Sequence, residues 1–308
     1  MSKTYGIISD LHCTNLQIIS LAIDILKQEE INALVLNGDL IGDQTTYHPQ
    51  DYLATILNYA GESDLETYVL PGSHEEFHLF EPVVDHFSKK FNNIINTSDY
   101  QKVEQNDHHL IFLPGSDWRT GDAVNHGYSV EELNGSGIYK HKDQYIRVFN
   151  LHDLKKLVTE PDKTILFSHI PRRFSNPETG VDTAEFYEAQ QPFQLNHKPV
   201  DVGSIFPKIV GDQLSKQGAP LQFKRENRGN EILQKLYTEL GVTKNITGHF
   251  HESAGKAHDS YGNPLEEGLF VSHLFYNASC LDRLMIGMVT IDNNKVAYEN
   301  IDLRNYSN

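Results

Sequence analysis

The stretch that decides the fold is Leu34-Val35-Leu36-Asn37-Gly38-Asp39-Leu40-Ile41-Gly42-Asp43, a short apolar run that ends in a glycine and a carboxylate. Such a run predicts a buried parallel strand that delivers Asp39 to the carboxyl edge of a sheet. Open α/β sheets bind their ligands at that edge. Taken alone, the stretch is equally typical of a strand that stops at a solvated turn. Four other stretches end in the same way, each in an Asp or His beside a tight turn, and they favour a site.

Five motifs share this position at the end of a predicted strand. In chain order they are Asp10-x-His12, Gly38-Asp39-x-x-Gly42, Gly72-Ser73-His74-Glu75, Ser168-His169 and Gly248-His249-x-His251. Two carboxylates and four or five imidazoles at one sheet edge form a mixed oxygen and nitrogen ligand set, which suits Mn, Fe, Zn or Ni better than Mg or Ca. We therefore predict two divalent transition-metal ions with Asp39 between them as a bridging ligand. Glycines at 38, 72 and 248 fit this site, because backbone that turns sharply beside a metal leaves no room for a Cβ.

From Asp10 to His251 these motifs resemble those of the calcineurin-like metallophosphoesterase superfamily. The resemblance implies that Asp10, His12 and His251 bind a first metal, that His169 and His249 bind a second, and that Asp39 bridges them. It implies that His74 is the acid that protonates the leaving oxygen. The implied fold is a four-layer α/β/β/α sandwich of two mixed β-sheets flanked by helices, which the strand-rich C-terminal part matches.

The implied activity is hydrolysis of a phosphomonoester or phosphodiester, in which the two ions activate a hydroxide for attack on phosphorus in line with the leaving group. A small phosphate ester or a nucleotide is the expected substrate. The fold does not choose among monoesterases, diesterases, pyrophosphatases and nucleases. A catalytically weakened or inactive binding scaffold is the alternative from another class. Loss of metal ligands would mark such a scaffold, and here only one position departs from the superfamily pattern.

That position is Ser73, where the superfamily pattern has an Asn that supplies a neutral carbonyl oxygen to the second metal. A serine hydroxyl is shorter and a poorer ligand for a divalent ion. Ser73 acts through a bridging water, or the second metal is held more weakly, or the site has lost its chemistry. We favour weaker but functional binding, because every other ligand and His74 are present.

Composition narrows the remaining function classes. The 308 residues are 39% hydrophobic and 10% aromatic, which is typical of one large globular domain over 1–308. No apolar run approaches the roughly 18 residues of a membrane helix. The formal charge of −16 opposes loose binding to nucleic acid and to anionic membranes. The start of the chain lacks the pattern of a signal peptide, so the cytoplasm is the expected location. The sequence leaves the oligomeric state open.

Strands and helices alternate through the first half of the chain. We expect strands at 4–9, 67–70, 110–113, 164–167 and 245–247, and helices at 16–30, 49–60, 77–91, 151–158 and 230–240. We also expect Gly61 to end the second helix, and three further strands at 269–272, 285–291 and 296–303. Insertions at about 114–146 and 171–229 have no clear period and are expected over the site face, where long loops tend to be lids or binding elements, or else disordered.

Several residues beside the motifs have both a functional and an ordinary interpretation. Arg172 and Arg173 follow the His169 loop and could clamp substrate oxygens, although an exposed basic pair is slightly favoured. Asp43 and Glu75 could orient metal ligands or His74, or simply be solvated. Trp118 could wall the site or serve packing.

The remaining candidates are expected to be ordinary. Cys13 and Cys280 are too few for a disulfide framework and are expected to be reduced, without a ligand role. A basic group at Lys224, Arg225 and Arg228 is expected to be a solvated face. Structural or surface roles are expected for His48, His78, His86, His108, His109, His152, His197 and His273.

Overall fold

A computed structural model describes residues 2–12, 14–42, 48–116, 119–120, 123–124, 127–129, 136–141 and 144–306. Two six-stranded mixed sheets form its centre. In spatial order, the first sheet contains Lys295–Asp302 (β22), Met285–Asp292 (β21), Lys3–Ile8 (β1), Ala33–Asn37 (β2), Glu66–Leu70 (β3) and Ile94–Asn96 (β4). The second contains Ala257–His258 (β19), Leu274–Asn277 (β20), Lys244–Thr247 (β18), Thr164–Ser168 (β12), His109–Leu113 (β6) and Lys102–Glu104 (β5).

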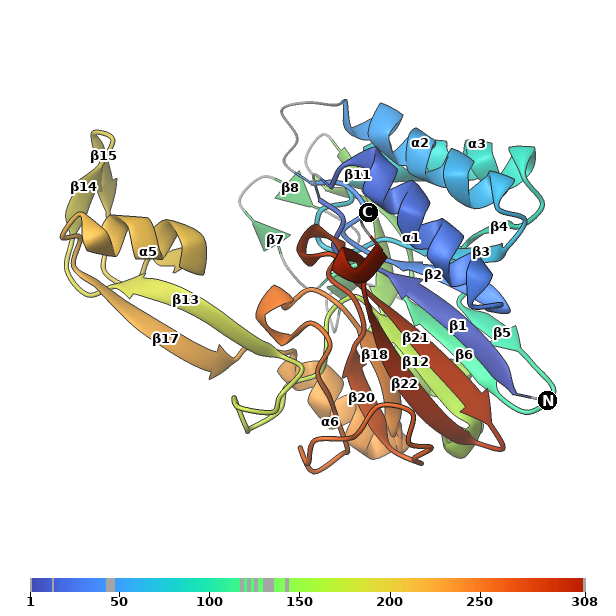
Figure 1. Ribbon diagram of the computed structural model, residues 1–308. Coiled ribbons are helices and arrows are strands. Elements are labelled where there is room, and N and C mark those ends of the chain that lie inside the picture. The colour runs from blue at the N-terminus through green and yellow to red at the C-terminus, as the bar shows by residue number, and fades with distance from the viewer. Residues whose placement is uncertain are drawn as a thin grey trace.

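Helices cover the outer face of each sheet (Figure 1). The first sheet packs against Leu16–Gln28 (α1), Pro49–Glu62 (α2) and Phe77–Lys90 (α3). The second packs against Leu154–Leu157 (α4) and Glu231–Leu240 (α6). Alternate strand residues of both sheets, such as Val35 and Phe167, fill a separate core between them. Burying each such side chain stabilises the fold by about 1.5–3 kcal/mol. The predicted α/β/β/α sandwich is therefore confirmed.

The strand directions explain where the motifs meet. β1 to β4 run parallel, and so do β6, β12, β18 and β20, whereas the outer strands β21, β22, β5 and β19 are antiparallel to their neighbours. The carboxyl ends of the parallel strands lie at the same end of the sandwich. Hydrogen bonds join the two sheets there, because Gly115 donates to the carbonyl of Pro71, and the Asn37 amide donates to the carbonyl of Ser168 at 3.3 Å.

Most expected helices and strands occur within a few residues of their predicted bounds. Asn15 caps α1 by accepting from the backbone of Gln17, and Asn230 caps α6 in the same way. Gly241 ends α6 in the left-handed conformation, with φ of 70°. The turn between β21 and β22 has positive φ at Asn293 and Asn294, as a tight hairpin requires.

Two predictions about element bounds were wrong. Gly61 does not end α2, which continues to Glu62 and is followed by a positive φ at Asp64. A Cβ at Gly61 would lie 2.4 Å from the ring of Phe91, so this glycine allows close packing of α2 against the segment after α3. Residues 269–272 do not form the expected strand. Val271 makes an isolated bridge to Val296, and the strand in this part of the chain is β20, which begins at Leu274. Hydrophobic composition was misleading there, because Leu269 and Phe270 are exposed.

The segment from 172 to 228 contains regular elements that the sequence did not reveal. They are Thr183–Ala189 (β13), Phe193–Leu195 (β14), Lys198–Val200 (β15), Ile205–Pro207 (β16), Lys208–Lys216 (α5) and Leu221–Asn227 (β17). β13 pairs with β16 and β17, and the long ribbon of β13 and β17 carries α5 and the β14–β15 hairpin away from the sandwich (Figure 1). We call residues 183–227 the arm.

The other insertion contains short strands at Arg119–Thr120 (β7), Ala123–Val124 (β8), Gly127–Ser129 (β9), Gly137–His141 (β10) and Gln144–Asn150 (β11). β10 and β11 pair in antiparallel fashion, and β9 runs parallel to β11. The predicted roles of Trp118, Asp43 and Cys13 fall outside the described residues. The division of the chain into one domain with two insertions stays a prediction.

Candidate metal centre

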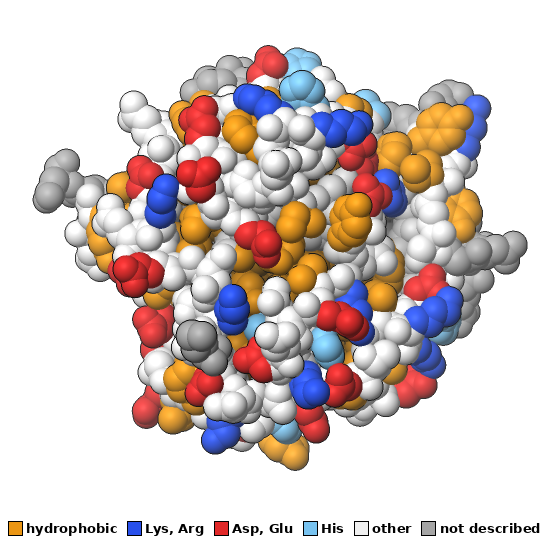
Figure 2. Space-filling model, turned by 90° about the vertical axis from the view of Figure 1, so that its right-hand side faces the viewer, with side chains coloured by type: hydrophobic (Ala, Val, Ile, Leu, Met, Phe, Trp, Pro, Cys, Tyr) orange, Lys and Arg blue, Asp and Glu red, His pale blue; other side chains and the backbone are white. Residues whose placement is uncertain are grey.

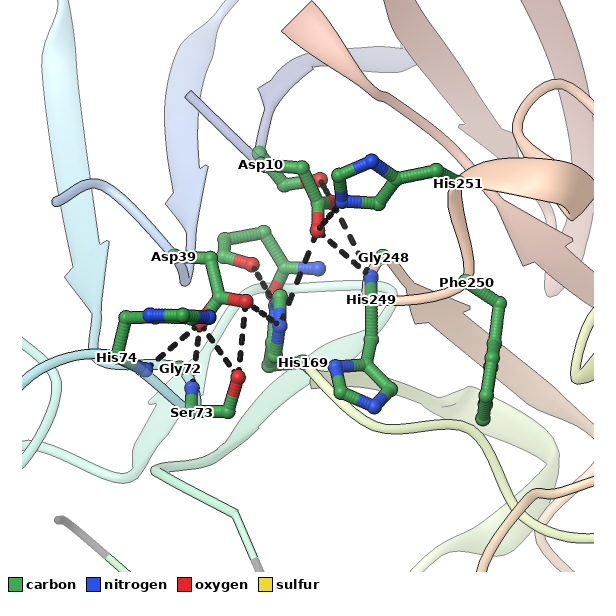
Figure 3. A network of polar contacts seen from close by, with 12 residues as sticks. Asp10, Asp39, Gly72, Ser73, His74, His169, Gly248, His249, Phe250 and His251 are labelled. Atoms are coloured by element: carbon green, nitrogen blue, oxygen red, sulfur yellow. Dashed lines mark hydrogen bonds and ion pairs between the residues drawn. The ribbon is translucent and has the colours of Figure 1, made fainter. Parts of the chain in front are cut away.

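The ends of five strands bring the motif residues together (Figure 3). Asp10 and His12 follow β1, Asp39 follows β2, Ser73 and His74 follow β3, His169 follows β12, and His249 and His251 follow β18. Positive φ angles occur at Asp10 (53°), His12 (42°), Asp39 (50°) and His249 (71°). Non-glycine residues adopt this region at a cost of order 1–3 kcal/mol each, and such strain gathers at functional sites.

Glycines leave the space that these turns need. A Cβ at Gly72 would lie 2.4 Å from both the backbone nitrogen and Oδ1 of Asp39. One at Gly38, where φ is +84°, would lie 2.6 Å from the His169 ring, and one at Gly248 would lie 2.5 Å from Asp10 Oδ2. The predicted reason for glycine at these three positions therefore matches the packing.

The motif side chains form two groups of potential metal ligands. Asp10, His12 and His251 present ligand atoms within 4.8 Å of one another, and so do Asp39, His169 and His249. These are the two sets that the superfamily resemblance implies. Asp39 also forms such a group with His12 and His74, so its carboxylate lies between the two sets.

Asp39 is held by several donors. His169 Nε2 lies 2.9 Å from its Oδ2, and the backbone N–H groups of Ser73 and His74 donate to its Oδ1 at 2.5 and 3.0 Å. Burial would raise the pKa of this carboxyl, but the nearby His169 holds it well below its usual range. The buried carboxyl of Asp39 is therefore ionised, which is the state a bridging ligand needs.

Asp10 is equally enclosed. Its carboxylate accepts from the backbone N–H of His249 at 3.1 Å and from the Ser9 hydroxyl at 2.6 Å, and its Oδ1 lies 3.3 Å from His251 Nε2. Burial opposes ionisation, yet the contact with His251 and the charge of His169 lower the pKa of Asp10 to about 2.

The donor atoms fit bound cations. His169 Nδ1 donates to the carbonyl of Asn37 at 3.0 Å, which in a neutral ring leaves a lone pair on Nε2. That Nε2 is buried and lies 2.9 Å from Asp39 Oδ2 and 4.0 Å from Asp10 Oδ1. Burial lowers the pKa of this ring, but the charge of Asp39 raises it to about 10, so a proton occupies Nε2 unless a cation replaces it. The Nε2 atoms of His12 and His251 likewise face each other at 3.1 Å. Acceptor atoms that converge in this way repel one another unless a proton or a metal ion lies between them.

Ser73 makes a contact that the sequence alone did not indicate. Its hydroxyl lies 3.0 and 2.9 Å from Oδ1 and Oδ2 of Asp39 and donates to that carboxylate. The hydroxyl therefore contacts the proposed bridging ligand, and its role toward a second metal stays a prediction.

Glu75 is buried rather than solvated. Its Oε2 accepts from the backbone N–H groups of Asp39 and Gly72, and its Oε1 accepts from that of Ile41. Burial and the negative charge of Asp39 raise the pKa of Glu75 to about 7. Because it bonds to both loops, Glu75 fixes the Asp39 turn against the Gly72 turn.

Sequence reasoning missed Asp282. Its Oδ2 lies 3.3 Å from Nδ1 of His251, and its Oδ1 accepts from the Cys280 thiol at 2.8 Å. The backbone N–H of Asp282 donates to the carbonyl of Asp10, which holds this turn beside β1. A carboxylate behind a metal-binding imidazole fixes the ring and its tautomer. No local pattern marks Asp282, because its contact with His251 is made only in the fold.

The structure places Arg172 and Arg173 away from the ligand groups. The Arg172 guanidinium lies over the rings of Phe174 and Phe275, and Arg173 pairs with Glu231. Neither has a contact with a proposed metal ligand among the described residues. Their role in substrate binding stays a prediction.

Several of the side chains that we expected to be ordinary have structural partners. His108 Nε2 lies 2.7 Å from the hydroxyl of Tyr5, and His109 Nε2 lies 2.9 Å from Glu160. Lys224 pairs with Glu188, and Arg225 pairs with Glu178 at 2.8 Å.

Comparison with known proteins agrees with this geometry. A family model described as calcineurin-like phosphoesterase matches residues 3–253. The chain belongs to the calcineurin-like phosphoesterase family. No curated protein matches the sequence.

Among solved structures, the protein TT1561 of Thermus thermophilus is 10% identical, with a TM-score of 0.55 over 97% of this chain and 99% of that one. At this identity the likeness concerns the fold alone. A dimetal phosphatase from Danio rerio is 14% identical over 97% of this chain and 98% of that one, with a TM-score of 0.45, too low to add to the argument.

Proposed function

We propose that this family member is a metal-dependent phosphoric ester hydrolase that acts on a small phosphomonoester or phosphodiester. The observation that carries the proposal is that Asp39 forms one group of potential ligands with His169 and His249 and another with His12 and His74. His12 in turn belongs to the group of Asp10 and His251. Asp10, His12 and His251 would hold one divalent ion, His169 and His249 would hold the other, and Asp39 would bridge them. When bound, the two ions would neutralise phosphoryl oxygens and make water a stronger nucleophile.

His74 is the proposed proton donor to the leaving oxygen. Its backbone N–H is fixed on Asp39, and its half-buried ring lies 5.0 Å from the ring of His12. The His74 ring forms a group of potential ligand atoms with His12 and Asp39, and it belongs to neither the Asp10 set nor the His169 set. An imidazole in this position can give a proton to an alkoxide as the ester bond breaks.

The distribution of charged side chains supports a small substrate rather than a polyanion. On the face in Figure 2, Lys and Arg side chains are scattered among Asp and Glu rather than gathered into a basic patch. Together with the formal charge of −16, this opposes the polyanion binding of a processive nuclease. None of the described helices combines the length and the apolar composition of a membrane span.

The test is a panel of chromogenic monoesters, diesters and nucleotides, assayed with metal-stripped protein before and after addition of Mn²⁺. We expect hydrolysis only after the addition. His74→Ala should lower kcat by roughly 10²- to 10⁴-fold while the metal content is retained. Hydrolysis of no substrate would favour the binding scaffold, and hydrolysis unchanged by His74→Ala and Asp39→Asn would refute the proposed site.

A further inference from the structure

Among the described residues, Arg172 is a buried cation without an acidic partner. The residue is 8% exposed, and its guanidinium carbon lies 4.3 Å from the ring centre of Phe174 and 4.4 Å from that of Phe275. Nη2 donates to the carbonyl of Ser260 at 3.3 Å, whereas Nε is buried without a hydrogen-bond partner in the described ranges. Within that same part of the chain, no carboxylate lies within 4.0 Å of this guanidinium.

The carboxylate whose charge acts on Arg172 is Asp182, and it is already engaged elsewhere. Asp182 accepts from the backbone N–H groups of Phe174 and Gly229 and from the amide of Asn227. Burying a charge is unfavourable unless the charge is paired. Stacking on two aromatic rings compensates part of this cost, because the ring faces carry partial negative charge. It supplies no acceptor for the guanidinium N–H groups, which prefer the paired oxygens of a carboxylate or phosphate.

Arg172 is one of the residues that line a cavity of about 130 Å³. Its volume is several times what one water molecule needs. Polar side chains dominate its walls, which include Arg172, Ser175, Asn176, Gln234 and Ser260. The walls come from the loop after β12, from α6 and from the loop after β19, so packed elements rather than one surface loop define the space.

We propose that this cavity binds one anionic group of a small molecule, a phosphate or a carboxylate, with Arg172 as its counter-ion. None of the residues that line this cavity is a proposed metal ligand, and the proposal does not depend on metal binding. Arg173 lines the same cavity but is half exposed and already paired with Glu231, so its contribution should be small.

The test uses full-length, metal-stripped protein titrated with inorganic phosphate, and in parallel with acetate, by calorimetry at constant ionic strength. We expect one saturable site for at least one of the two anions. Arg172→Met keeps an unbranched stem between the rings and removes the charge, so it should weaken binding at least tenfold. Arg173→Met is the matched control and should change the affinity less than twofold.

Two further variants separate loss of the anion site from misfolding and from anion binding at the metal ligands. Arg172→Lys preserves the charge but not the planar pair of donors, and it should bind several-fold more weakly than wild type even if Arg172→Met does not fold. His249→Ala should bind as wild type does. The proposal is overturned if no anion binds, if the Arg172 variants bind as wild type does, or if only His249→Ala loses binding.

The anion has two sources, and kinetics with metal-loaded enzyme separates them. If the cavity holds a second anionic group of the substrate, Arg172→Met should raise KM for substrates that carry two such groups and leave KM for simpler esters unchanged. If it holds a free anion, both KM values should be unchanged while the calorimetric binding is lost. Either result supports the anion site.

Discussion

At the residue scale, the site consists of side chains that the backbone holds in strained or enclosed positions. Asp10 and Asp39 both have positive φ, and both are anions surrounded by N–H donors. A buried carboxylate of this kind is destabilised when a neighbouring substitution removes one of its hydrogen-bond donors or adds bulk beside it. Single substitutions here should therefore have effects that exposed positions do not show.

The first residue-scale prediction concerns Ser73. Ser73→Asn replaces a hydroxyl that donates to Asp39 with an amide whose carbonyl oxygen can bind a divalent ion. The second metal should bind at least roughly tenfold more tightly, a size typical of ligand and near-ligand changes. Titration of metal-stripped protein against a competing chelator measures this affinity. If wild type and variant both hold two tightly bound ions, Ser73 does not weaken the site.

The second residue-scale prediction concerns Asp282. Asp282→Asn removes the negative charge behind His251 Nδ1, so the first metal should bind about 10-fold more weakly. The same titration measures this affinity. Asp292→Asn, which alters a carboxylate on β21 away from the ligands, is the control and should have no effect. Equal affinity in the two variants would show that Asp282 does not position the imidazole.

At the element scale, the five site strands could be predicted because each ends in an Asp or His beside a turn, and a glycine marks that turn after β2, β3 and β18. β3 and β12 match their predicted bounds to within one residue. The arm could not be predicted in this way. Its strands lack a clear alternation of hydrophobic and polar residues, because a narrow ribbon has little core to bury. Four of the seven residues of β13 are half-buried, and β14 to β16 are half-buried or exposed throughout. The role of Asp282 could not be predicted either, because its partner His251 is distant in sequence.

The element-scale prediction concerns α2. Gly61→Ala should destabilise the protein by roughly 1–3 kcal/mol, because the new methyl group would overlap the ring of Phe91. In a helix where the new methyl group meets no neighbour, a glycine-to-alanine substitution instead stabilises the protein by up to about 1 kcal/mol. Urea unfolding measures the difference, and Phe91→Leu in the Gly61→Ala background should recover part of the loss. A gain in stability would contradict the packing of α2 on this ring.

At the whole-molecule scale, two sheets with separate cores place their strand ends on one site. The second sheet supplies His169, His249 and His251, and the first supplies Asp10, His12 and Asp39. Bound cations would therefore link the two halves of the sandwich. Ligands that bind only the folded state stabilise it in proportion to the logarithm of their concentration over Kd.

This link predicts a metal-dependent melting temperature. Mn²⁺ at about 100 times its Kd should stabilise metal-stripped protein by roughly 2.7 kcal/mol per site. Thermal unfolding followed by circular dichroism, with and without the ion, measures the shift. Mg²⁺ at the same concentration should give a smaller shift, because imidazole nitrogen is a poor ligand for it. Equal shifts for both ions would argue against a histidine-rich centre.

The most direct test of the account counts the metal ions bound per chain. Elemental analysis at equilibrium with excess Mn²⁺, corrected for the free ion, should give two ions per chain in wild type and at most one in Asp39→Asn, because the substituted residue is the one proposed ligand that both ions share. Wild-type protein without bound metal, or an equal count in Asp39→Asn, would contradict the proposed centre.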